Sequence, residues 1–210
     1  VKNLNIENIS IKMSPSTYGV EAAGFACGVS GVVENCHTQG KIEAGGSGAG
    51  GFAYGAQGKN TTIIRNCSAD VELYGLWNVA GFITSSFVDY LHREVPVKII
   101  SCSSYGSVTG REYAGMPSYD YIGQIAGFVS NASDTVFENC HLSTPVYLEG
   151  NAKFVGSFVA NTAETAVYKN CTYNPATSST YPLIGLLNWQ KAGDYSKDSF
   201  TPSTTAQDGM

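Results

Sequence analysis

The feature that most constrains this chain is a repeat that returns at intervals of about 30 residues. Five short segments, rich in β-branched and aromatic residues, each end in Asn-Cys or Ser-Cys; they are residues 32–36, 63–67, 99–102, 136–140 and 167–171. Their cysteines are separated by 31, 35, 38 and 31 residues. An aliphatic residue follows four of these cysteines six residues later, at Ile42, Leu73, Val108 and Val146, whereas the fifth copy has Thr177 there.

A second motif, ending in Phe after one or two small residues, precedes each of these segments. Its copies end at Phe25, Phe52, Phe82, Phe128 and Phe158, at intervals of 27, 30, 46 and 30 residues. Residues 184–186 form a weaker sixth copy, in which Leu186 follows Phe158 by 28 residues. The repeat unit is therefore close to 30 residues, and its third copy is longer than the others, with insertions at about 83–97 and 111–122.

Each unit contains three short apolar runs separated by Gly, Asn, Ser or Asp, which predicts a coil of three strands. A single coil cannot bury its apolar face, so coils must stack in parallel. The sequence thus predicts an all-β fold, a right-handed parallel β-solenoid (β-helix) of about six three-strand coils, forming one domain over residues 1–210. Helical repeats need amphipathic stretches of ten or more residues, which glycine interrupts here.

Stacking places equivalent residues in ladders along the solenoid axis. The five Phe residues are expected to form one inward ladder, and the five aligned Cys residues another. Asn35, Asn66, Asn139 and Asn170 stand beside the cysteines and suit turns, because Asn tolerates a left-handed backbone and its amide can bond the neighbouring coil. Alternating apolar residues in residues 1–12 predict part of a preceding coil.

The ordered pattern of Gly-Phe, an aliphatic pair before Asn-Cys, and a later aliphatic residue resembles the GLUG repeat of bacterial surface proteins. It extends over roughly residues 20–175 in five copies. The resemblance implies a secreted or cell-surface bacterial protein, adhesin-like, and implies no chemistry within the repeats. Such repeats also occur in large immunoglobulin A peptidases, outside the catalytic part. The long third coil, and Phe where the family often has Leu, depart from the usual pattern.

Composition excludes several classes of partner. Charged residues are 14% of the chain, the net charge is −5, and no run of Lys or Arg is present, so nucleic acid is not an expected partner. No stretch approaches 18 consecutive apolar residues, so direct membrane insertion is not expected. The chain begins with Val1 rather than Met, and we expect it to be part of a longer surface protein. Its oligomeric state and any ligand identity stay open at this point.

Neither the histidines nor the cysteines predict a metal site or a cofactor. His37 and His141 each follow a ladder Cys but are expected about three coils, roughly 15 Å, apart, which is too far to share a metal. Stacked cysteines point the same way and are poorly placed for disulfides, so a ladder of inert thiols is expected. Cys27 stands off that ladder, which leaves its redox state open.

No catalytic residue is predicted, although parallel β-helices often carry polysaccharide-active enzymes. The carboxylates that an enzyme of that class would need are Glu43, Asp70 and Glu72, which adjacent coils could bring together. Lys41 alternates with Glu43, which favours a solvated face instead. Residues 89–94, which include His92, hold the densest set of ionisable groups and fall in an insertion, where surface decoration is the simpler interpretation.

The most distinctive candidate site is an aromatic cluster in the long coil. Tyr presents a flat apolar face with a polar tip, which suits sugars and peptides. The predicted ligand-binding residues are Tyr113, Tyr119, Tyr121, Asp120, Arg111, Trp77 and Tyr105, and Tyr74 could add to the same side. A loop that packs its own aromatics on the solenoid is the plainer alternative. The favoured function is thus a non-catalytic, extracellular binding module for a glycan or a host surface protein; the alternatives are a polysaccharide-active enzyme and a passive spacer.

Overall fold

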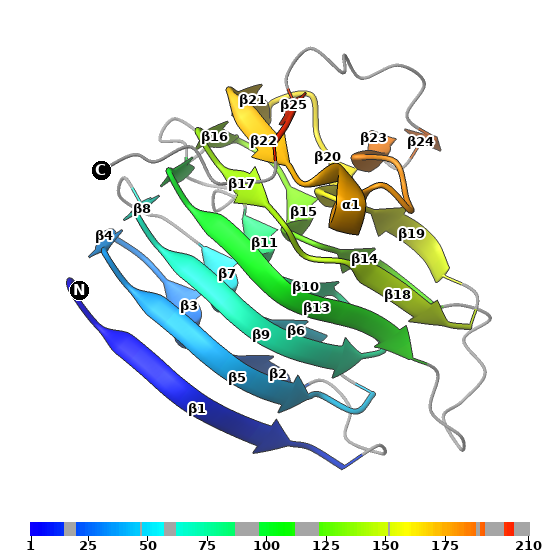
Figure 1. Cartoon of the computed structure of the whole chain (residues 1–210), viewed down its shortest axis with the longest axis horizontal. Helices are drawn as coiled ribbons and strands as arrows, with labels where there is room; N and C mark the ends of the chain where they lie inside the picture. Colours follow the sequence, from blue (N-terminus) through cyan, green and yellow to red (C-terminus); the bar gives the residue numbers. More distant parts are fainter. Residues whose placement is uncertain are drawn as a thin grey trace.

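The computed structural model shows a β-solenoid whose strands form four sheets that run along its length (Figure 1). The structure describes residues 1–14, 20–46, 48–56, 62–86, 97–111, 122–150, 152–187, 190–191 and 200–203. Every pairing between successive coils within these sheets is parallel; the one antiparallel pair joins β23 to β24. The all-β solenoid predicted from the repeat is thus confirmed.

Each coil passes through the four sheets in a fixed order. The chain first enters the first short sheet, of β2 (Glu21–Ala23), β6 (Gly48–Gly50), β10 (Val79–Ala80), β14 (Ile122–Ala126) and β19 (Ala152–Gly156). It then enters the second short sheet, of β3 (Ala26–Val29), β7 (Ala53–Ala56), β11 (Ile83–Ser86), β15 (Val129–Ala132), β20 (Val159–Thr162), β23 (Ile184–Leu187) and β24 (Gln190–Lys191).

The second half of each coil completes the circuit. The third short sheet contains β4 (Val32–Glu34), β8 (Ile63–Arg65), β12 (Val97–Ile100), β16 (Thr135–Glu138) and β21 (Val167–Lys169). The long sheet contains β1 (Asn5–Lys12), β5 (His37–Glu43), β9 (Ser68–Gly75), β13 (Ser103–Arg111), β17 (His141–Leu142), β18 (Val146–Glu149), β22 (Cys171–Tyr173) and β25 (Phe200–Pro202). The long sheet faces the viewer in Figure 1, from blue β1 to green β13.

The number of coils and of strands per coil differs from the prediction. The described residues form five complete coils, preceded by β1 and followed by β23, β24 and β25. Each coil passes through four sheets rather than three, and in the fourth coil the long sheet receives two strands, β17 and β18. The extra strand arises because the chain turns sharply at each Gly-Phe motif: a Cβ on Gly50 would lie 2.0 Å from the Ala53 carbonyl oxygen. One expected apolar run is therefore divided between the first and second short sheets.

Glycine occupies this bend in the first four coils, where neighbouring coils approach closely, whereas Ser157 occupies it in the fifth. A Cβ on Gly81 would lie 2.1 Å from the carbonyl oxygen of Gly127 and 2.4 Å from Ser104 Oγ on β13. The same position in the preceding coil, Gly51, would meet the Gly81 carbonyl oxygen at 2.0 Å and Ala69 Cβ on β9 at 3.3 Å. The bend therefore points inward, toward the long sheet.

The predicted phenylalanine ladder forms the centre of the core. Phe25, Phe52, Phe82, Phe128 and Phe158 stack with ring centroids 4.8, 4.9, 4.9 and 4.6 Å apart. All except Phe25 are fully buried. Leu183, not Leu186, occupies the next position, because Phe158 N donates to the Leu183 carbonyl oxygen while Leu186 pairs with Asn161. The sixth copy of the Phe motif therefore ends at Leu183, three residues before the predicted Leu186.

The cysteine ladder is also confirmed. Cys36, Cys67, Cys102, Cys140 and Cys171 are buried free thiols, and each Sγ lies 3.2–3.6 Å from the carbonyl oxygen two residues before it. Ile42, Leu73, Val108 and Val146 form a further buried ladder in register on the long sheet. Thr177 does not extend this ladder, because it lies in the short helix α1 (Pro175–Ser178).

The predicted asparagine turns join the third short sheet to the long sheet. Asn35, Asn66, Asn139 and Asn170 have φ between 50° and 54°, and Asn3 and Ser101 occupy the same turn in their coils, with φ of 56° and 51°. Asn66 Nδ2 donates to Asn35 Oδ1 at 3.2 Å, and Asn35 Nδ2 donates to Asn3 Oδ1 at 3.0 Å. The pairing of β1 with β5 confirms that residues 1–12 belong to a preceding coil, although an irregularity separates Ile6 from Ile9.

Truncation of a ring inside the phenylalanine ladder should be costly, and more so than truncation at its end. Phe82→Ala removes a fully buried ring stacked on both sides and should lower the free energy of unfolding by about 3–5 kcal/mol. Phe25→Ala, at the half-buried end of the ladder, should cost less. Urea unfolding of both variants measures the difference, and equal losses would contradict the ladder.

The glycine bend gives a second test with an internal control. Gly81→Ala forces a Cβ against the backbone of the next coil and should destabilise the protein by about 3 kcal/mol, the upper end of overpacking costs. Gly28→Ala should be neutral or slightly stabilising, because a Cβ there meets nothing within 4 Å. Thermal unfolding of the two variants compares them, and a neutral Gly81→Ala would show that the coils do not approach at this bend.

Candidate binding surface on the long sheet

Part of the predicted aromatic site lies outside the described residues. This applies to Tyr113, Tyr119, Asp120 and Tyr121, and to most of both insertions, including His92. Arg111, Trp77 and Tyr105 are described, and they lie on or next to the long sheet. The described part of the candidate site therefore lies on or next to the long sheet.

Arg111 is the last residue of β13 and is held in place by two neighbouring coils. Its guanidinium donates to Glu149 through Nε at 2.6 Å and through a terminal nitrogen at 2.9 Å, a two-pronged geometry that fixes the planar group. The same group lies 4.8 Å from the ring centroid of Tyr74 on the preceding coil. Hydrogen bonding to Arg111 lowers the pKa of Glu149.

Tyr74 also contacts a second cation. Lys41 Nζ lies 4.8 Å from its ring centroid and 2.9 Å from Glu43, and Lys12 approaches Glu43 at 3.5 Å. The hydrogen bond between Lys41 and Glu43 is the main reason why the pKa of Lys41 is raised and that of Glu43 lowered. Tyr74 is thus an aromatic ring with two neighbouring cations, a favourable arrangement at a surface.

Tyr147 completes this surface on the far side of Arg111. Register places Tyr74 opposite Thr109, and Thr109 opposite Tyr147, so the two tyrosines are about 10 Å apart in one column. Tyr147 is 55% exposed. We call Lys41, Glu43, Tyr74, Arg111, Tyr147 and Glu149 the tyrosine–arginine patch.

The sequence placed Trp77 and Tyr105 in the same site as Arg111, whereas in the structure neither lies in the tyrosine–arginine patch. Trp77 lies in the corner between β9 and β10, half-buried against the core, with its ring against the backbone of Gly123. Tyr105 is on β13, six residues and about 20 Å before Arg111, and its ring lies 6.1 Å from that of His141. Of the predicted site residues that are described, Arg111 belongs to the patch, together with Tyr74, which the sequence named as a possible addition.

Sequence reasoning missed Tyr147 and Glu149, although a signal for Tyr147 was present. The residue after each aliphatic residue of the Ile42 ladder must point outward, because side chains alternate along a strand. Those residues are Glu43, Tyr74, Thr109 and Tyr147. Glu149 then follows from the pairing of its strand with Arg111.

The carboxylates of the enzyme alternative are interleaved with other groups on this face. Register places Asp70 opposite Gln39, Glu72 opposite Lys41, and Glu43 opposite Tyr74. Gln39 Nε2 donates to Asp70 Oδ2 at 3.3 Å. A general acid at neutral pH needs a raised pKa, whereas that of Glu43 is lowered.

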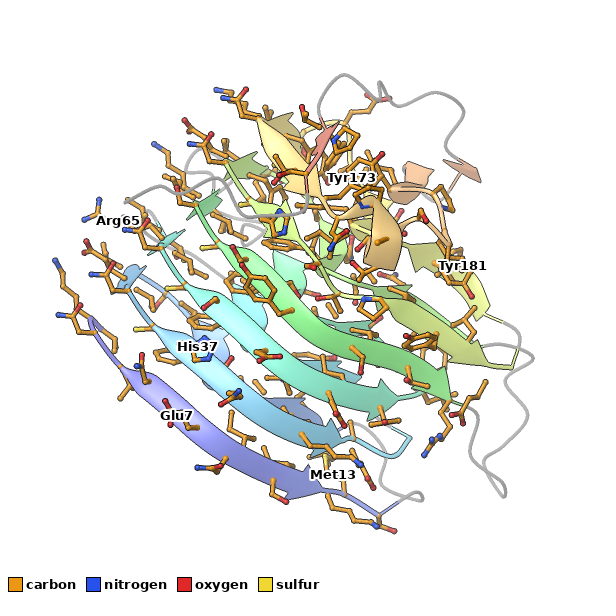
Figure 2. All side chains as sticks on the ribbon, viewed as in Figure 1. Glu7, Met13, His37, Arg65, Tyr173 and Tyr181 are labelled. Atoms are coloured by element: carbon orange, nitrogen blue, oxygen red, sulfur yellow. The ribbon has the colours of Figure 1, made fainter. Side chains whose placement is uncertain are left out.

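His37 and His141 occupy one column of the long sheet, three coils apart. His37 Nδ1 lies 2.8 Å from Ser68 Oγ, and His141 Nδ1 lies 2.8 Å from Thr172 Oγ1. Figure 2 shows His37 on β5, far from the end of the sheet where Tyr173 lies. Within the described ranges, no three His, Cys, Asp or Glu side chains are placed to hold a metal ion. Cys27 is an exposed thiol, 3.6 Å from the carbonyl oxygen of Glu21.

Comparison with protein-family models, with curated proteins and with solved structures gives no match to this chain. In the part of the chain that the structure describes, no helix has the length and apolar character needed to cross a membrane. The resemblance to GLUG repeats therefore stays a prediction from the sequence.

His141 should make the stability of the protein depend on pH. It is 1% exposed, its Nε2 has no hydrogen-bond partner among the described residues, and burial lowers its pKa. The unfolded chain therefore protonates His141 more readily than the folded chain does. The contribution of neutral His141 to the free energy of unfolding is fully present above the unfolded pKa of about 6.5 and declines as pH falls below it. Urea unfolding between pH 7.5 and 5 should show this decline.

His141→Gln should flatten that pH dependence, while His37→Gln, at the half-exposed position of the same column, should leave it in place. The lowered carboxyl pKa values of Glu34, Glu43 and Glu149 act only at more acidic pH. An unchanged slope in His141→Gln would show that His141 does not cause the decline.

Proposed function

We propose that this chain is a non-catalytic binding module, adhesin-like, that recognises a glycan or a surface protein through the tyrosine–arginine patch. The observation that carries the proposal is the exposure of Tyr147 beside an Arg111 that Tyr74 and Glu149 hold in place. We include export and display at a cell surface in the proposal, on the resemblance to GLUG repeats.

The patch has the properties of a preorganised contact surface. Its side chains project from four adjacent strands, β5, β9, β13 and β18, whose register is fixed by the buried ladders beneath them. A rigid sheet lowers the entropy lost when a partner binds. Tyrosine supplies a flat apolar face and a hydroxyl group, and arginine supplies planar hydrogen-bond donors, so these residues suit sugars and peptide groups alike.

The charged residues of the tyrosine–arginine patch limit the class of ligand that this surface favours. The cations Lys41 and Arg111 are matched by the anions Glu43 and Glu149, each within hydrogen-bond distance of its partner. A patch of balanced charge favours a neutral or weakly charged ligand over a polyanion such as nucleic acid. A neutral glycan or a protein surface fits these conditions.

Two alternative functions, an enzyme and a passive spacer, are judged from the same outer face of the long sheet. A polysaccharide-active enzyme would use Glu43, Asp70 or Glu72, but Lys41 stands opposite Glu72 and bonds Glu43, which favours ion pairing over acid–base chemistry. A passive spacer is supported by the internal pairing of the charges, since a solvated face with no partner also pairs its charges. The spacer is the stronger of these two alternatives.

Immobilised glycans and mucins test the proposal directly. The unmodified chain should bind at least one member of the panel, and Tyr147→Ala should weaken that binding about tenfold or more through the loss of its exposed ring. Tyr147→Phe should retain most of the affinity if the ring carries the contact. Val167→Ala removes an apolar side chain that is 40% exposed on the third short sheet and should have no effect.

The other outcomes separate the alternatives. Release of shorter sugars from the bound glycan, abolished by Glu72→Gln, would indicate an enzyme. Binding that Tyr147→Ala leaves unchanged would place the site elsewhere. Absence of binding to both glycans and mucins would favour the spacer.

A further inference from the structure

One end of the solenoid exposes the interior ladders. Three of the strongly exposed large apolar residues lie there, with exposed fractions of 64% for Val1, 42% for Leu4 and 47% for Val20. Phe25 is half-buried at this end, whereas Phe52, on which it stacks, is fully buried. Figure 2 shows Glu7 on β1, the strand at the edge of the long sheet, and Met13 just beyond its end.

The edges of three sheets are open together at this end. β1, β2 and β3 are the terminal strands of the long, first short and second short sheets, and each pairs with a neighbour on one side only among the described residues. Terminal strands present unpaired backbone donors and acceptors that can receive another strand. β5 pairs with β1 on both sides of the irregularity between Ile6 and Ile9. A strand like β5 can therefore pair with the open edge of β1 in the same way.

Two columns of charge end in lysine at this surface. The first alternates Arg65, Glu34 and Lys2, with successive contacts of 3.0 and 2.9 Å. The second joins Glu43 to Lys12 at 3.5 Å. The side chains of Lys2 and Lys12 are 61% and 80% exposed, so each can accept an acidic neighbour from the open side.

The asparagine ladder has a direction that continues beyond the same end. In the first coils the amides donate toward β1: Asn66 Nδ2 donates to Asn35 Oδ1, and Asn35 Nδ2 donates to Asn3 Oδ1. By the same geometry, the Asn3 amide is directed to the position that the oxygen of a further Asn would occupy. The ladder therefore specifies a polar residue in the same turn.

We propose that this open end is an interaction surface for a further parallel coil, supplied by polypeptide outside residues 1–210. The partner has acidic residues opposite Lys2 and Lys12, Asn opposite Asn3, and apolar residues opposite Leu4 and Ile11. Residues 31–43 of this chain have this pattern, with Glu34, Asn35, Cys36, Ile42 and Glu43 at those five positions of the register.

A second copy of the chain fits this end poorly. Two identical ends facing each other would bring lysine columns against lysine columns, and the two-fold relation would reverse the strand direction that every coil pair uses. The opposite end differs in structure: Phe200 lies 4.9 Å from Phe158, and β24 adds an antiparallel strand. A head-to-tail arrangement therefore does not repeat the internal coil contact.

A peptide copy of residues 31–43, with Cys36→Ala to prevent oxidation and with blocked termini, tests the proposal. Titration calorimetry with the 210-residue protein should show saturable binding, and amide hydrogen exchange should slow in β1. A matched peptide that also has Glu34→Lys and Glu43→Lys should bind about tenfold more weakly, since two ion pairs become two repulsions. The protein variant Lys2→Glu/Lys12→Glu should reverse that preference.

Three outcomes would overturn the proposal: no binding of the first peptide, equal binding of both peptides, or protection that appears elsewhere than in β1. Dimerisation of the protein that excludes the peptide, seen by analytical ultracentrifugation, would instead assign the surface to a second copy. Tyr147→Ala should leave peptide binding unchanged, so this test and that of the glycan-binding patch can fail separately.

Discussion

In-register stacking of one coil on the next is the constraint on which the rest of this structure depends. The phenylalanine centroids are separated by 4.6–4.9 Å, which matches the spacing of adjacent strands, so ring stacking and backbone pairing are satisfied by the same translation. Each buried aromatic ring contributes about 1.5–3 kcal/mol through burial alone. A shift of one residue would turn every inward side chain outward, so the ladders and the register stabilise each other.

The ladders could be predicted from the sequence because a repeat forces equivalent residues into equivalent environments. The fourth strand of each coil could not, because the residues flanking Gly-Phe are mostly small or apolar and read as one run. The bend depends on a close backbone approach such as that of Gly81 to Gly127. Leu183 was missed for a related reason: without Phe, residues 184–186 matched the motif by their glycine, whereas the register is set by the pairing of Val159 with Ile184. Of the aromatic residues in the patch, the sequence pointed to Tyr74 but not to Tyr147, because loop aromatics were favoured over outward positions on the strands.

The tyrosine–arginine patch and the open end both follow from the same stacking. Inward positions are filled by Phe, Cys and aliphatic residues, which leaves the alternate positions of the long sheet free to carry Tyr74, Arg111 and Tyr147. Stacking also means that an end without a neighbouring coil exposes its ladders, as Val1 and Leu4 do. A solenoid of this kind therefore has two distinct surfaces, a lateral face with fixed side chains and an end at which the ladders are exposed.

Backbone amide contacts across coils test the central claim most directly. Nuclear Overhauser effects should connect residues of paired strands in successive coils, such as Val33 with Ile64, Ile64 with Ile99, and Phe137 with Tyr168. The account predicts such contacts at the parallel register along the third short sheet. Sequential helical contacts in these segments, or pairings displaced by one residue, would contradict it.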